Sequence, residues 1–184
     1  VIPLKLLLLQ YMWKFMKRFF YLLIFIVTGL ACNDGDIDQS SFDFDETVNV
    51  CGEYTLYRLS TNGQKEALIV TLTDDQIKLE EGTFTANVTL SGPVTVTDRV
   101  FAEKVTGSYF CAAVPPVEPK VKKDWRGVSG KILVQNEVVY DASGLNVVSY
   151  KHTVVLNDVV LESGEDSLIF DDTYLFGVFS TAVN

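Results

Sequence analysis

The chain has few of the residues on which catalytic and metal sites depend, with one histidine and three cysteines in 184 residues. The single histidine, His152, would need a nucleophile and an orienting acid beside it to act in a hydrolase, and no Gly-x-Ser-x-Gly elbow is present. No cysteine has a second cysteine or a histidine at the spacing of metal ligands, and no glycine-rich phosphate loop occurs. The sequence therefore predicts no catalytic residue, no metal site and no cofactor, and it assigns His152 to the fold or to the surface.

Positive charge is also scarce. Lys5, Lys14, Lys17 and Arg18 are the only charged residues among the first 31, which leaves 11 basic against 24 acidic residues in the rest of the chain. Binding to phosphate backbones needs clustered lysine and arginine, so this balance argues against a nucleic-acid partner. The most basic segment that follows, residues 120–126, is predicted to be a solvated loop or a strand edge.

The first 31 residues have the pattern of an export signal. From Met16 the chain reads MKRFFYLLIFIVTGLAC, with two basic residues, an apolar run and then small residues before Cys32. The apolar stretch is about 13 residues long, whereas roughly 20 are needed to cross a membrane. We therefore expect residues 1–31 to be a helical signal peptide, with Met16 as the true start of translation.

The segment Gly29-Leu30-Ala31-Cys32 resembles the bacterial lipobox, although its leucine lies one place nearer the cysteine than is usual. This resemblance implies that the chain is cut before Cys32 and that lipid is attached to Cys32. The lipid would then anchor the protein in its partner, the membrane. Two or more acyl chains are enough for a stable anchor. The alternatives are an ordinary secretory peptide that is cut nearby, and a signal anchor in which Cys32 has no special role.

An acidic segment follows Cys32, and the chain has no basic residue there until Arg58. Such a segment buries too little apolar surface to become ordered, so residues 32–47 are predicted to be a flexible tether. Acidic residues directly after the lipidated cysteine also resemble the surface-export signal of Bacteroidetes lipoproteins. This resemblance implies an outer-membrane lipoprotein on the cell surface, with a periplasm-facing lipoprotein as the alternative.

Residues 48–184 have the composition and spacing of a single β domain. They are rich in valine, threonine and aromatic residues, show no helical apolar spacing, and are interrupted by turn residues. Residues 131–140 and 146–161 flank the turn 141–144 and predict a long hairpin, and residues 74–81 are the only helix candidate. Seven to nine strands without crossover helices predict an all-β fold, an antiparallel β-sandwich of the immunoglobulin-like type, with a small β-barrel as the alternative.

Two cysteines remain after Cys32, and in an oxidising compartment Cys51 and Cys111 are expected to form a disulfide. Two buried thiols are the alternative. The aromatic residues of the second half are expected to form the core of the sandwich. Trp125 is the exception and a candidate for partner binding, because it lies in the charged, proline-flanked segment.

The export pattern, the Cys-Gly-Glu-Tyr sequence at Cys51 and the Tyr-Phe-Cys sequence that ends at Cys111 together resemble small lipoproteins of Flavobacteria and their relatives. The resemblance implies membrane display but no particular activity. The sequence favours a non-enzymatic binding or structural module whose partner is a protein or a glycan. The alternatives are a carrier of a small apolar ligand inside a barrel and, third, a hydrolase that uses His152 or a pair of acids.

Overall fold

The computed structural model describes residues 42–183 except 53, 115 and 171–172. Nearly all of the regular structure is antiparallel β-sheet, and one short helix is present among the described residues. The elements in chain order are β1 Asn49–Cys51, β2 Thr55–Leu59, β3 Glu66–Thr71, β4 Gly82–Asn87, β5 Thr95–Phe101, α2 Gly107–Cys111, β6 Val121–Tyr140, β7 Val147–Ser163, β8 Asp166–Ile169 and β9 Tyr174–Ala182.

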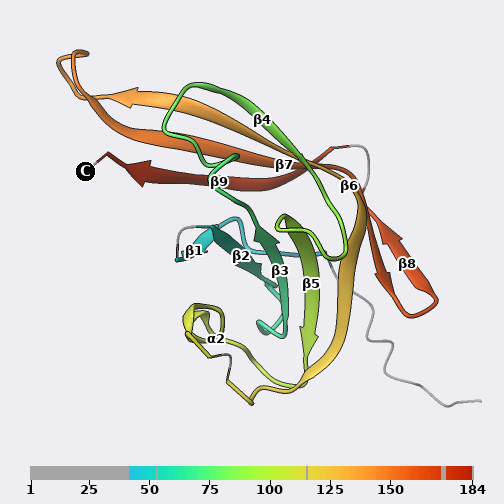
Figure 1. Ribbon diagram of the computed structural model, residues 1–184. Coiled ribbons are helices and arrows are strands. Elements are labelled where there is room, and N and C mark those ends of the chain that lie inside the picture. Colours follow the sequence, from blue (N-terminus) through green and yellow to red (C-terminus); the bar gives the residue numbers. More distant parts are fainter. Residues whose placement is uncertain (1–41, 53, 115, 171–172, 184) are drawn as a thin grey trace, which may run out of the picture. The chain divides into compact units, whose positions relative to one another are not determined.

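The strands form one antiparallel sheet in the order β1-β2-β3-β5-β6-β7-β8, with β4 paired to β6 and β9 paired to β7. The first part of β6 pairs with β5 and its second part with β4, while β7 pairs with β9 first and with β8 near its end. The two long strands therefore run through two layers, one containing β4 and β9 and the other containing β1, β2, β3 and β5 (Figure 1). The all-β antiparallel prediction is confirmed, and the sheet is open, so residues 42–183, as far as they are described, do not form the closed barrel of the alternative.

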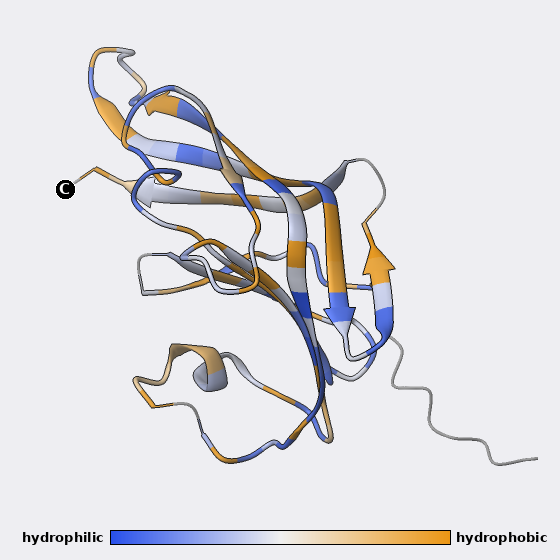
Figure 2. Ribbon diagram, turned by 45° about the vertical axis from the view of Figure 1, so that its right-hand side comes forward, coloured by the Kyte–Doolittle hydropathy of each residue, from blue (hydrophilic) through white to orange (hydrophobic). Residues whose placement is uncertain are grey.

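The main core contains residues from both of these layers. Hydrophobic and hydrophilic residues alternate along the long strands, so each strand buries one side and exposes the other (Figure 2). Leu56, Leu68 and Val96 come from the layer of β2, β3 and β5, whereas Val134, Val154 and Phe176 come from the other. As predicted, most of the described aromatic residues of the second half of the chain lie in this core or in the smaller one described next.

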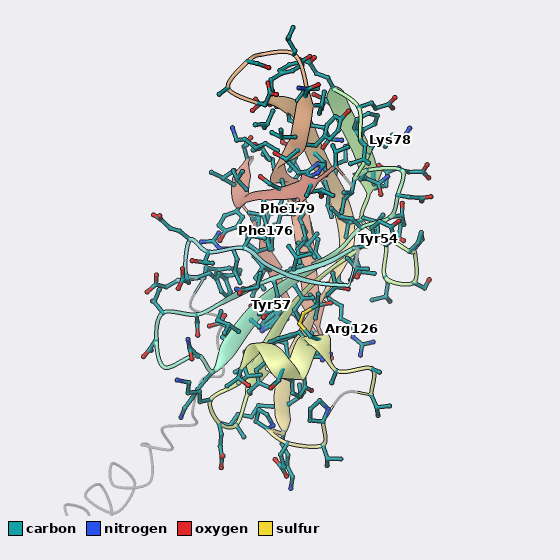
Figure 3. The ribbon with its side chains drawn as sticks, turned by 90° about the vertical axis from the view of Figure 1, so that its left-hand side faces the viewer. Tyr54, Tyr57, Lys78, Arg126, Phe176 and Phe179 are labelled. Atoms are coloured by element: carbon teal, nitrogen blue, oxygen red, sulfur yellow. A yellow bond between two sulfur atoms is a disulfide. The ribbon has the colours of Figure 1, made fainter. Side chains whose placement is uncertain are left out.

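A second, smaller core covers the opposite face of β2, β3 and β5. Its buried residues are Ala67, Phe101, Val105 and Tyr109, and Phe110 of α2 stacks on Tyr57 with ring centroids 4.3 Å apart. The disulfide between Cys51 and Cys111 joins the end of β1 to the end of α2 (Figure 3). The two cysteines are 60 residues apart in sequence, and closing a loop of this length stabilises the fold by about 4 kcal/mol in the chain-entropy model.

The domain begins earlier than the sequence predicted. The acidic composition predicts a flexible tether through residue 47, but Phe44 is buried in the main core and forms an isolated β-bridge with Ser60. The buried guanidinium of Arg58 fixes this segment: it donates to the carbonyl oxygen of Phe44 at 2.9 Å, to that of Asp45, and to that of Phe176 in β9 at 2.8 Å. The tether prediction failed here because it was based on the acidic composition, whereas Phe44 belongs to the core and Phe42 packs against it.

The remaining elements agree with the sequence predictions only in part. The long hairpin is present as β6 and β7, and β6 starts ten residues before the predicted strand. Residues 74–81 form turns and bends and no helix, while the helix that does form, α2, was not predicted. The predicted signal peptide, its start at Met16, the lipid site Cys32 and the tether up to residue 41 lie outside the described residues. In the described part, no helix has the length and apolar character needed to cross a membrane.

Candidate functional site

His152 is completely buried in β7 and belongs to a hydrogen-bonded group of three side chains. Its Nδ1 lies 2.6 Å from Oδ1 of Asn136 in the paired strand β6, and its Nε2 lies 3.1 Å from Oγ1 of Thr181 in β9. The ring also stacks on Phe179, with centroids 4.7 Å apart. No substrate could reach the imidazole in this position, and burial lowers the pKa of His152 because it disfavours the charged form.

Asn136 determines which nitrogen of His152 carries the proton. Its amide Nδ2 donates to the carbonyl oxygens of Gln76 at 3.2 Å and Lys78 at 3.1 Å, so its Oδ1 must face the imidazole as an acceptor. Nδ1 of His152 therefore donates to Asn136, and the neutral ring accepts at Nε2 from the hydroxyl of Thr181. This group connects the loop after β3 to the sheet, which is a structural role and agrees with the assignment of His152 to the fold.

Trp125 does not form the binding site that the sequence suggested. It is 3% exposed in the main core, on the inner side of β6, and Lys123 covers its ring at 4.1 Å from the centroid. The lysine also forms an ion pair with Asp166 at 2.9 Å. The prediction failed because Asp124 and Arg126, which flank Trp125 in the sequence, have their side chains on the opposite side of the strand, while the indole points into the core and Lys123 covers it.

The candidate site lies where β6 and β7 depart from regular pairing. Ser129 pairs with Val160 and Lys131 pairs with Asn157, so the single residue Gly130 faces two residues, Asp158 and Val159, across a β-bulge. The backbones approach so closely that a Cβ on Gly130 would lie 2.5 Å from the Cα of Val159. Bulges of this kind redirect side chains and are common beside binding sites.

An open hollow of about 360 Å³ lies at this bulge. The carbonyl oxygen of Gly130 accepts from the amide of Val88 at 3.0 Å, so the end of β4 forms one wall of the hollow. Its lining residues come from β6, from β7 and from the end of β4; they are Asn87, Val88, Val128, Ser129, Gly130, Lys131, Asn157 and Asp158. We call this feature the bulge hollow.

The register of the strands brings three polar side chains of the bulge hollow together. Lys131 in β6 pairs with Asn87 in β4 on one side and with Asn157 in β7 on the other. Residues that are directly paired across strands have their side chains on the same face, about 5 Å apart at Cβ. Within the described part of the chain, Asn87, Ser129 and Lys131 have no side-chain hydrogen bond or ion pair, which leaves their polar groups available to a ligand.

Asp158 has an unusual backbone conformation, with a φ of 51°. Aspartate tolerates this left-handed region better than most residues, but its cost is still higher than that of glycine. Its carboxylate accepts a hydrogen bond from Nδ2 of Asn157 at 2.7 Å, which holds the two side chains together at the mouth of the bulge hollow. Backbone conformations that are not the most favourable occur often at binding sites.

Sequence reasoning missed this site, although a signal for it is present. Asn157 and Asp158 interrupt an apolar run in the predicted second strand of the hairpin, and Gly130 directly precedes the predicted first strand, residues 131–140. A glycine within a strand, opposite a polar pair in the partner strand, indicates a bulge. Comparison of the chain with protein-family models, with curated proteins and with solved structures finds no match.

Proposed function

We propose that this chain is an exported lipoprotein, anchored through Cys32, whose β domain is a non-enzymatic binding module that holds its partner at the bulge hollow. The bulge hollow carries the binding part of this proposal, since it combines a concave surface with five hydrogen-bonding side chains from three strands. Small-molecule sites have volumes of about 300–1,000 Å³, and the bulge hollow falls at the lower end of that range.

Two observations support export and a binding role. A disulfide such as Cys51–Cys111 persists in oxidising compartments, which agrees with an exported domain. His152, one of the two features that a hydrolase could use, is wholly buried among Asn136, Thr181 and Phe179. The closed barrel that an apolar carrier would require does not form among the described residues. These observations favour a binding module over a hydrolase that uses His152 and over an apolar carrier.

Affinity capture with matched variants tests this proposal. The intact lipoprotein is cross-linked in its own envelope and purified, and its protein and glycan companions are identified by mass spectrometry. Asn157→Ala removes a side chain of the bulge hollow, whereas Lys151→Gln alters the same strand outside it, where Lys151 forms an ion pair with Glu137 at 2.9 Å. We expect a companion that is captured by the wild type and by Lys151→Gln and is lost with Asn157→Ala. A companion captured equally by all three, or no companion at all, would contradict the proposal.

A further inference from the structure

We infer that the bulge hollow binds a neutral, hydroxyl-rich segment of a glycan chain. This inference rests on the proposed function and names the ligand class of the same site. It follows from the charge of the lining, from the kinds of polar group there, and from the openness of the hollow.

The charges of the bulge hollow favour a neutral ligand. Lys131 and Asp158 are its only ionisable residues, and they carry opposite charges, so the lining is neutral as a whole. An ion of either sign would be attracted by one of these groups and repelled by the other, so the lining gives it no net attraction. A neutral polar ligand does not depend on such an attraction.

The polar groups of the lining suit neighbouring hydroxyls. Each sugar hydroxyl both donates and accepts, and the amides of Asn87 and Asn157 each offer one acceptor and two donors, of which Asn157 already uses a donor on Asp158. Ser129 adds a hydroxyl, Lys131 adds donors, and the carboxylate of Asp158 adds acceptors. Val88 and Val128 add an apolar surface that can contact the C–H groups of a sugar ring.

The lining is poorly suited to a protein partner. The residues that dominate protein–protein affinity are tryptophan, tyrosine and arginine, which are anchored in desolvated pockets. The bulge hollow has none of these three and no other aromatic residue. A protein would thus find hydrogen-bonding groups here but no anchor, whereas a sugar is recognised through such groups.

The hollow is open, which indicates a segment of a polymer. A free small ligand is usually buried over 70–90% of its surface, and an open hollow of about 360 Å³ cannot enclose one to that extent. A chain of sugars can place one or two units in the hollow while the rest extends over the sheet. Binding at a single site will be weak, and many anchored copies on one membrane would increase the overall avidity.

The test uses the full chain in detergent micelles, labelled with ¹⁵N, and titrated with hexasaccharides of glucose, xylose, mannose and N-acetylglucosamine. The side-chain amides of Asn87 and Asn157 and the backbone amides of Gly130 and Asp158 are followed in ¹H–¹⁵N spectra. We expect at least one neutral hexasaccharide to shift these resonances at millimolar concentration. An anionic hexasaccharide of galacturonic acid is the comparison, and we expect it to bind more weakly.

Two variants connect binding to the site. Asp158→Gly is expected to keep the fold, because glycine adopts a φ of 51° more readily than aspartate, while the loss of the carboxylate weakens binding about tenfold. Asn157→Ala is expected to have a similar effect on binding, and Lys151→Gln none. Thermal unfolding of each variant separates a loss of binding from a loss of the fold.

Three results would overturn the inference: no shift with any neutral hexasaccharide, stronger binding of the anionic one, or equal binding by wild type and Asp158→Gly. If these titrations are negative while envelope capture still gives a protein companion that depends on Asn157, the binding module stands and the glycan assignment is wrong. If both experiments are negative, the proposed function itself fails.

Discussion

At the level of single residues, His152 shows how a polar group can be buried without acting in chemistry. Its proton donor Nδ1 and its acceptor Nε2 each have a partner, in Asn136 and Thr181. The cost of burying an imidazole is therefore offset only for the neutral form, because burial disfavours the charge. Any condition that protonates His152 should weaken the domain.

This leads to a pH dependence of stability. Burial lowers the pKa of His152 in the folded state below the value of about 6.5 that it has when unfolded. Below that unfolded value the unfolded state binds more protons than the folded state, so the free energy of unfolding decreases as the pH falls from about 7 to 5. Urea unfolding at a series of pH values measures this slope.

The variant His152→Gln is the control for that slope, because His152 is the only histidine in the chain. We expect the variant to be less stable at pH 8 but to lose less stability between pH 7 and 5. If the variant does not fold, NMR titration of the His152 ring in the wild type measures the pKa directly. A folded-state pKa at or above 6.5, or an unchanged slope in His152→Gln, would contradict the prediction.

At the level of elements, the bulge between β6 and β7 depends on Gly130. Its φ is 106°, and a Cβ would lie 2.6 Å from the carbonyl oxygen of Asp158 and 2.5 Å from the Cα of Val159. Both of these are backbone atoms, which cannot move aside as a flexible side chain would. Gly130→Ala should therefore destabilise the domain by roughly 2–4 kcal/mol, as measured by chemical denaturation.

Gly144 provides the matched control for this substitution. It also has a positive φ, 73°, in the turn between β6 and β7, but its Cβ position has no atom within 4 Å. Gly144→Ala should therefore cost only about 1–2 kcal/mol, the backbone penalty alone. Equal losses in the two variants would show that the close approach of the strands adds nothing to the effect of backbone conformation.

The long strands were predictable from local sequence patterns, whereas the signal for the bulge can be recognised only when the pairing of the two strands is known. Alternation of apolar residues depends on one local property, the period of two along a strand, and it located the long hairpin. The bulge results from the pairing of distant residues, Lys131 with Asn157 and Ser129 with Val160, and an alternation along a single strand does not show which residues pair. Trp125 illustrates the same limit, because the sequence shows its charged neighbours but not the core residues against which the indole packs.

The helix α2 and the start of the domain were missed for a related reason. α2 is only five residues long, and it is held by the disulfide and by packing of Phe110 on Tyr57 rather than by a helical apolar pattern. Phe44 is buried because Arg58 and β9 hold its segment in place. In both cases distant contacts overcome a local composition that favours irregular structure.

At the level of the whole molecule, the proposed anchor and the domain are separate parts that can be tested separately. The lipid would be attached at Cys32, whereas Cys51 and Cys111 are already paired with each other in the domain. Cys32→Ser should therefore leave the disulfide and the fold unchanged and affect only the attachment of the chain to the membrane.

Cell fractionation measures this prediction. We expect wild-type protein in the membrane fraction and Cys32→Ser in the soluble exported fraction, because a chain without acyl groups loses the energy of lipid insertion. Protease treatment of whole cells that express the wild type then distinguishes display on the cell surface from display toward the periplasm. Retention of Cys32→Ser in the membrane would contradict the lipid anchor and would favour a signal anchor that is not cut, and mass spectrometry of the N-terminus would distinguish that outcome from retention through a membrane-bound partner.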